Sequence, residues 1–139
     1  MRMADGKNIF DWAQVSGSAQ VSGSAQVSGS AWVSGDGKLE RTADYATVGP
    51  IGSREDTLTM YRTARGMIEV TTGYFRGTYR EFRAALAAKH KKSSEHYRDY
   101  DVAAGALYAM MVQRGKRYKW LDAKAERGIK PKQPNRRKK

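Results

Sequence analysis

A six-residue phrase repeats through the first third of the chain, and it restricts the possible folds more than any other feature. In residues 13–33 the phrase is Ala-x-Val-Ser-Gly-Ser. Its frame, a small residue followed two positions later by an apolar one, continues to Ile51. A period of six fits neither the 3.6-residue period of a helix nor the two-residue period of a strand. It is typical of a parallel β-helix, in which each hexad makes one short side of a coil.

The hexads predict a short left-handed parallel β-helix over residues 9–54. With about eighteen residues per coil, the apolar residue of each hexad faces inward and stacks on the apolar residue three hexads later. Ser and Gly face outward and permit tight turns. A flexible Ser/Gly-rich linker is the alternative, although a linker has no reason to place an apolar residue at every sixth position. The predicted solenoid core consists of Val15, Val21, Val27, Val33, Leu39, Tyr45 and Ile51.

The hexads supply little more than two coils, which is short for a repeat fold. Repeat architectures generally need about three units and capped ends to bury a continuous core. We therefore expect the rest of the chain, or other copies of it, to cover the ends, and we expect a homo-oligomer.

Residues 55–115 predict an α+β cap on the solenoid. Residues 57–72 contain two runs of β-forming residues around Gly66, which is typical of a hairpin. Thr78 and Glu81 match a capping box that begins a helix over about 78–91. Ser93 or Ser94 begins a second helix over about 94–114, which Gly115 is expected to end.

The predicted fold class is therefore α+β, with a hexapeptide solenoid capped by a hairpin and two helices. Residues 1–8 are expected to form a flexible start. Residues 116–139 are expected to form a basic, partly disordered tail that is mobile when the protein is alone.

Positive charge is concentrated in the second half of the chain. The net charge is +12, but residues 1–56 contain five Lys or Arg and seven acids, a net −2. Residues 57–139 contain twenty-one Lys or Arg and seven acids, a net +14. This asymmetry indicates a polyanionic partner, of which nucleic acid is the commonest. The predicted contact residues are basic, or aromatic between basic neighbours: Lys89, Lys91, Lys92, Arg114, Lys116, Arg117, Tyr118, Lys119, Trp120, Arg136, Arg137, Lys138 and Lys139.

Residue patterns for catalysis and metal binding are absent from the sequence. The chain contains no cysteine and no phosphate-binding glycine motif. Acyltransferases built from hexapeptide repeats need a catalytic histidine in the solenoid, whereas His90 and His96 lie outside the hexads. The Asp residues are scattered rather than arranged as metal ligands. We predict a protein that is not an enzyme, with no cofactor and no metal.

No apolar run reaches the length of a signal peptide or the roughly twenty residues that span a bilayer. We therefore expect a cytoplasmic protein without a membrane partner.

Several segments together resemble a family of small proteins of unassigned function from tailed bacteriophages and prophages. The hexads are followed by Val48-Gly49-Pro50-Ile51-Gly52-Ser53-Arg54, and then by Thr72-Gly73-Tyr74-Phe75-Arg76-Gly77-Thr78 and Glu81-Phe82. The resemblance covers roughly residues 13–110, and the segment from Lys116 onward departs from it. It implies a phage origin, hence the host cytoplasm, and a left-handed β-helix, but it implies no established activity.

Two functional hypotheses follow. The first is a phage accessory protein that binds nucleic acid or a host nucleoprotein complex through its basic half, and that inhibits a host defence or transcription complex. Lys and Arg would neutralise phosphates, and Tyr118 and Trp120 would stack on exposed bases. The alternative is a structural or assembly protein in which the solenoid mediates oligomerisation. A tail that only improves solubility would give the same charge pattern.

Overall fold

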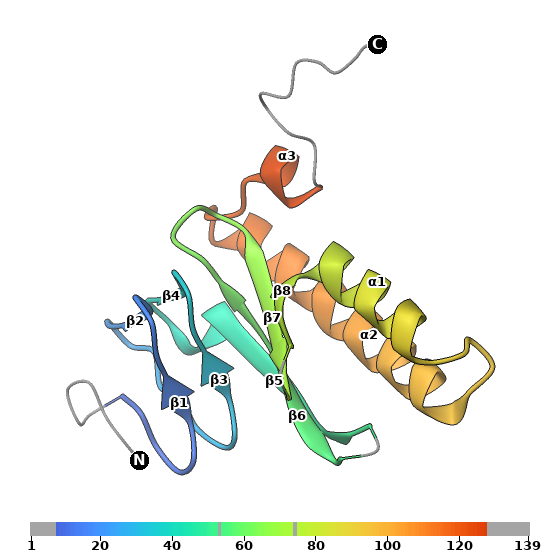
Figure 1. Ribbon diagram of the computed structural model, residues 1–139. Coiled ribbons are helices and arrows are strands. Elements are labelled where there is room, and N and C mark those ends of the chain that lie inside the picture. Colours follow the sequence, from blue (N-terminus) through green and yellow to red (C-terminus); the bar gives the residue numbers. More distant parts are fainter. Residues whose placement is uncertain (1–7, 53, 74, 128–139) are drawn as a thin grey trace.

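The structure is a computed structural model that describes residues 8–52, 54–73 and 75–127, and it has an α+β fold (Figure 1). The hexads contain four two-residue strands and a 3-10 turn. The remaining residues form four longer strands and three helices. In chain order the elements are β1 (Gln14–Val15), β2 (Gln20–Val21), β3 (Trp32–Val33), β4 (Lys38–Leu39), η1 (Thr42–Asp44), β5 (Tyr45–Ile51), β6 (Asp56–Arg62), β7 (Ile68–Thr72), β8 (Phe75–Thr78), α1 (Tyr79–Lys89), α2 (Glu95–Arg117) and α3 (Ala123–Glu126).

An antiparallel sheet in the order β5-β6-β7-β8 lies between the hexads and the helices (Figure 1). Side chains along β6 alternate between the two faces of the sheet, so the sheet packs against a different layer on each face. Leu58 and Met60 are fully buried in the core that the sheet shares with α1 and α2. Tyr61, on the opposite face, is fully buried in a second core among the hexad residues. The molecule is thus built in three layers.

The predicted left-handed β-helix solenoid is wrong. The hexads form two parallel strand pairs, β1–β3 and β2–β4, after which the chain enters the antiparallel sheet. Tyr45 and Ile51, predicted as solenoid core, are the two ends of β5, which pairs with β6 in antiparallel register. Ile51 packs in the core between the sheet and the helices, together with Leu58 and Phe82.

Tyr45 packs against the hexad core, and the remaining predicted core residues also belong to it or pack against it. In the parallel pairs, residues eighteen positions apart face each other, as Val15 does Val33 and Val21 does Leu39. Val27 is fully buried and pairs in the same way with Ile9. The chain turns at a glycine in each hexad: Gly17, Gly23, Gly29 and Gly35 have φ between +57° and +67°, a region that L side chains rarely adopt.

Side chains of the antiparallel sheet form hydrogen bonds with the backbone of β3 and of the residue that follows it. The Trp32 N–H donates to the Thr59 hydroxyl at 3.2 Å, and the Ser34 N–H donates to the Tyr61 hydroxyl at 3.2 Å. The Thr71 hydroxyl donates to the Trp32 carbonyl at 2.7 Å. Buried backbone groups need such partners. The hydroxyls of β6 and β7 supply these partners and join the sheet to the hexads.

Both helix starts predicted from the sequence are confirmed. Thr78 Oγ1 accepts from the Glu81 N–H at 3.0 Å, and the Glu81 carboxylate accepts from the Thr78 N–H at 2.9 Å. The Ser94 hydroxyl accepts from the Tyr97 N–H at 3.2 Å at the start of α2. No helix within the described ranges has the length and apolar character needed to cross a membrane.

Most of the predicted flexible start, residues 1–7, lies outside the described residues. Asn8 is described, and its side-chain amide donates to the Ala25 carbonyl at 2.6 Å. Asn8, the last residue of the predicted flexible start, is therefore hydrogen-bonded to the hexads.

The first prediction tests the hydroxyl contacts between the layers. Tyr61→Phe removes the hydroxyl that accepts from the Ser34 N–H and donates to the Glu69 carboxylate at 2.8 Å. The partly buried Ser34 N–H loses its acceptor, and the Glu69 carboxylate, which stays 4.0 Å from Arg76, loses a donor, so the free energy of unfolding should fall by about 1–3 kcal/mol. Tyr97→Phe is the control, because Tyr97 is also buried but its hydroxyl makes no hydrogen bond among the described residues. Equal urea-denaturation midpoints for the two variants would contradict this account.

Candidate nucleic-acid interface

After the basic C-terminal end of α2, the chain reverses direction and packs against the folded domain. Tyr118 caps the helix, and Lys119 follows with φ +64°, the left-handed conformation common just after a helix end. The Trp120 N–H then donates to the Gly115 carbonyl at 3.0 Å. This reversal points consecutive residues in different directions. Tyr118 and Lys119 are exposed, whereas Trp120 is only 9% exposed.

Gly115 does not end the helix, which continues through Arg117. Its role is to allow close packing of the returning chain. A Cβ atom at Gly115 would lie 2.8 Å from the Leu121 Cβ and 3.3 Å from the Trp120 ring. Trp120, predicted to stack on bases, is a core residue in the structure. The sequence pattern of alternating basic and aromatic residues does not reveal which aromatic ring faces inward.

The residues that follow are also attached to the fold, up to the end of the described range. The Asp122 N–H donates to the Gly66 carbonyl at 2.8 Å. In α3, the Glu126 carboxylate accepts from the Ile68 N–H at 2.7 Å and from the Tyr108 hydroxyl at 2.6 Å. Burial raises the pKa of Glu126. The structure thus differs from the predicted boundary at residue 116, because residues 116–127 belong to the folded domain.

Tyr118 is the exposed aromatic side chain of this region, with 38% of its surface accessible. The Arg41 guanidinium lies 4.3 Å from the centre of the Tyr118 ring, and the Arg117 guanidinium lies 5.8 Å from it. Both distances are those of cation–π contacts. Sequence reasoning missed Arg41, because no local pattern brings the end of the hexads to the end of α2.

The buried carboxylate of Asp44 forms ion pairs with two arginines that contact the aromatic rings of this region. Its fully buried carboxylate pairs with Arg41 at 3.2 Å and with Arg62 at 3.3 Å. The Arg62 guanidinium lies 5.6 Å from the centre of the Trp120 ring. Asp44 therefore orients two cations, one against the exposed Tyr118 and one against the buried Trp120.

Six of the basic residues predicted as contacts lie in two separate regions of the fold. Lys116, Arg117 and Lys119 are exposed at the end of α2, and no acidic side chain in the described ranges forms an ion pair with them. Lys89, Lys91 and Lys92 lie at the opposite end of α2, which is about 35 Å long at 1.5 Å per residue.

The other basic residues predicted as contacts are Arg114 and four residues at the C-terminus. Arg114 is partly buried and donates to the Ala43 and Tyr45 carbonyls at 3.4 and 3.3 Å, which ties α2 to β5. Arg136, Arg137, Lys138 and Lys139 lie outside the described residues.

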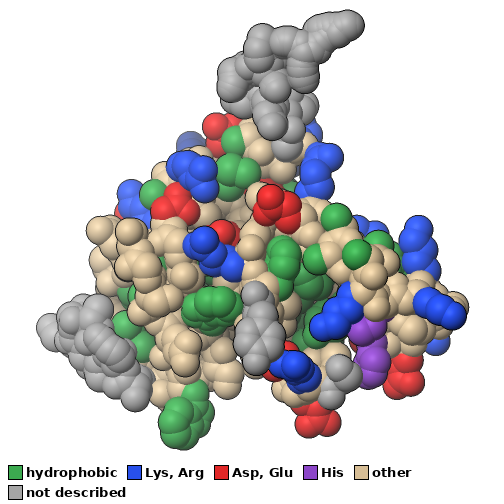
Figure 2. Space-filling view, viewed as in Figure 1, with side chains coloured by type: hydrophobic (Ala, Val, Ile, Leu, Met, Phe, Trp, Pro, Cys, Tyr) green, Lys and Arg blue, Asp and Glu red, His purple; other side chains and the backbone are tan. Residues whose placement is uncertain are grey.

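The hexad layer contrasts with this basic end. Residues 12–35 contain no charged side chain. Figure 2 shows the corresponding lower left of the molecule with little charge, while Lys and Arg gather over the helices. We call Arg41, Lys116, Arg117, Tyr118 and Lys119 the C-terminal basic surface.

Comparison of the chain with protein-family models, with curated proteins and with solved structures gave no match. The resemblance to phage and prophage proteins therefore stays a prediction.

The second prediction concerns Gly115. In an exposed helix, Gly→Ala stabilises by up to about 1 kcal/mol. Gly115→Ala should instead lower the free energy of unfolding by about 1–3 kcal/mol, because the new methyl group displaces Leu121 and Trp120. Gly105→Ala in the same helix is the matched control and should stabilise, since its methyl group would meet only the Tyr79 hydroxyl, at 3.7 Å. Stabilisation by both variants would show that Trp120 does not pack against Gly115.

Proposed function

We propose that the protein binds nucleic acid, alone or within a host nucleoprotein complex, through the C-terminal basic surface. The observation that carries this proposal is the position of Tyr118, exposed between two guanidinium groups and next to exposed Lys116 and Lys119. Cations neutralise phosphates and release counterions, while an aromatic ring offers a surface for a base. The combination suits a polyanion with stacking bases better than it suits an acidic protein.

The sequence beyond α3 extends the same chemistry. Residues 128–139 contain six Lys or Arg and no acidic residue. The described residues place Arg127, which precedes them, next to α1, since its carbonyl accepts from Arg80 at 2.6 Å. The segment thus continues from the same folded domain that carries the C-terminal basic surface. Such a contact recognises phosphates without reading sequence.

The third prediction separates the two basic regions by salt dependence. Lys116→Gln/Lys119→Gln should reduce the slope of log affinity against log salt by about 1.4 on a single strand and about 1.8 on a duplex. Lys91→Gln/Lys92→Gln removes the same charge from exposed positions at the other end of α2 and should leave the slope unchanged. The measurement is fluorescence anisotropy of a labelled oligonucleotide between roughly 50 and 200 mM salt.

Tyr118→Ala extends this test to base stacking. The free energy of binding to a single strand should become less favourable by about 1–3 kcal/mol, with little change for a duplex. No binding by the wild-type protein at the lowest salt would refute the proposed function. Equal slope changes for the two double variants would refute the assignment to the C-terminal basic surface.

A second function, self-assembly, is favoured by a different observation. Among residues 8–52, 54–73 and 75–127, β1 and β2 each pair with a strand on one side only, which leaves their outer edges without a partner strand in the described part of the chain. Nearby Trp12 is 79% exposed and Phe10 is 38% exposed. Free strand edges beside exposed apolar rings are typical of contacts between chains. The partner we propose is a second copy of this chain, joined through the hexad layer.

The fourth prediction tests this contact by sedimentation. The wild-type protein should sediment at micromolar concentration with at least twice the 15.5 kDa mass of the chain. Trp12→Arg should convert it to a monomer, because the charge cannot be buried in the contact. Val102→Arg, at an apolar position of α2 that is 72% exposed, should not. A wild-type mass of one chain across a hundredfold dilution would exclude self-assembly.

A further inference from the structure

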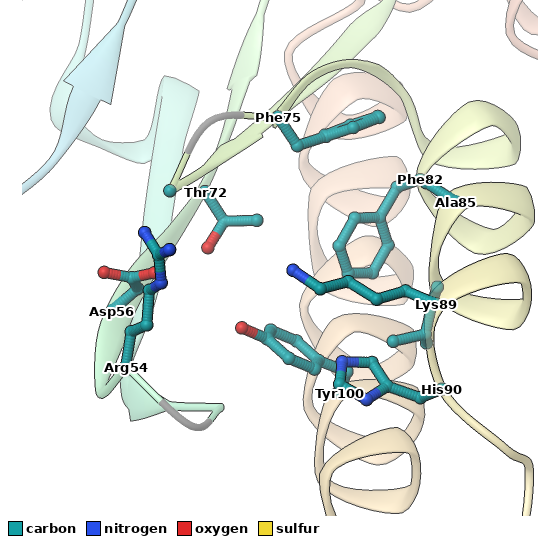
Figure 3. Close-up of a pocket in the computed structure, with 11 residues that line it drawn as sticks. Arg54, Asp56, Thr72, Phe75, Phe82, Ala85, Lys89, His90 and Tyr100 are labelled. Atoms are coloured by element: carbon teal, nitrogen blue, oxygen red, sulfur yellow. The ribbon is translucent and has the colours of Figure 1, made fainter.

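A pocket of about 310 Å³ lies between the two long helices and the end of the sheet where β6 begins (Figure 3). Its apolar wall consists of Phe75, Phe82, Ala85 and Leu86. The volume is at the lower end of the range of roughly 300–1,000 Å³ for small-molecule sites. The pocket includes Lys89 at the end of α1, so it lies at the other end of the helical layer from the C-terminal basic surface.

Polar groups face this wall from both layers. In Figure 3 the Lys89 ammonium and the Tyr100 hydroxyl point from the helices toward Asp56 and Thr72 of the sheet. Lys89 makes no ion pair with any acidic side chain in the described ranges. His90 lines the pocket beside Tyr100, with 6.5 Å between the ring centres.

Two hydroxyl groups line the closed side of the pocket. Thr72 is only 8% exposed, and its hydroxyl has no partner with regular hydrogen-bond geometry among the described residues. Burial raises the pKa of Tyr100; the nearby Thr72 hydroxyl opposes this rise and the Asp56 charge adds to it. The Tyr100 hydroxyl points into the pocket, where it can donate a hydrogen bond. The two hydroxyls lie close to each other, and together they offer a polar contact for a ligand with oxygen or nitrogen atoms.

We propose that this pocket binds a nucleoside monophosphate, a ligand separate from the polymer bound at the C-terminal basic surface. The base would lie against Phe75 and Phe82, and the phosphate would lie against Lys89 and His90. The ribose hydroxyls would donate to the Asp56 carboxylate, an interaction that carboxylates commonly make with ribose.

Arg54 also lines the pocket, and its guanidinium lies beside Asp56 in Figure 3, so the polar side of the pocket carries a further cation for an anionic ligand. Inorganic phosphate would leave the aromatic wall uncovered. An aromatic carboxylate would bring no hydroxyl groups to this polar side, so neither matches the whole pocket.

Calorimetric titration of the full-length protein with the four common nucleoside monophosphates tests the proposal. At least one should bind with a Kd below about 1 mM. Ala85→Trp should abolish binding by filling the pocket from an exposed position on α1, whereas Ala88→Trp, exposed on the same helix but outside the pocket, should not. Lys89→Gln should weaken binding at least about tenfold, and Lys91→Gln should leave it unchanged. Unaltered melting temperatures would show that the variants remain folded.

Three results would overturn the proposal: no nucleotide binding by the wild-type protein at millimolar concentration, equal binding by Ala85→Trp, or equal affinity for benzoate or inorganic phosphate. Fluorescence anisotropy with the labelled oligonucleotide distinguishes a failure of nucleotide binding at the pocket from a failure of the proposed function. Ala85→Trp should bind the oligonucleotide as the wild-type protein does, because the pocket and the C-terminal basic surface lie apart.

Discussion

The fold depends on hydrogen bonds that join the backbone of Trp32 and Ser34 in the hexads to side chains of the antiparallel sheet. Strands of two residues are too short to form a stable sheet alone, and an open row of N–H and carbonyl groups must be paired, covered or exposed to water. Here Thr59, Tyr61 and Thr71 reach from the antiparallel sheet and pair with the backbone of Trp32 and Ser34. One face of the sheet thereby closes the hexad layer. The other face is left free to pack against the helices.

A second constraint, the buried carboxylate of Asp44, joins three distant parts of the chain. It pairs with Arg41 at the end of the hexads and with Arg62 in β6, and these arginines lie against Tyr118 and Trp120 after α2. Removing one partner of a buried ion pair is costly, so such a group holds its neighbours in place. This arrangement decides that Tyr118 faces water between two cations while Trp120 is buried.

The proposed contacts are distributed over the molecule according to its layers. Residues 12–35 of the hexad layer carry no charge, and the outer edges of β1 and β2 have no partner strand among the described residues, which suits contact between copies of the chain. The C-terminal basic surface lies at one end of α2, and the pocket that contains Lys89 and His90 lies toward the other. Binding at one of these places leaves the others open. A polymer, a small nucleotide and a second copy of the chain are therefore compatible partners.

The sequence by itself determined the local features, because each depends on residues close together in the chain. The capping box of Thr78 and Glu81, the Ser94 cap, the β6–β7 hairpin around Gly66 and the glycine turns of the hexads all follow from local patterns. Only the tertiary structure decided what covers each element. The hexad period specifies spacing and turns but not the number of layers, so it could not show that the hexads form two parallel strand pairs packed against an antiparallel sheet. Likewise, the run from Lys116 to Trp120 predicts a basic aromatic surface, but Gly115, Arg41 and Asp44 decide which ring is exposed, and they act through contacts that span the chain.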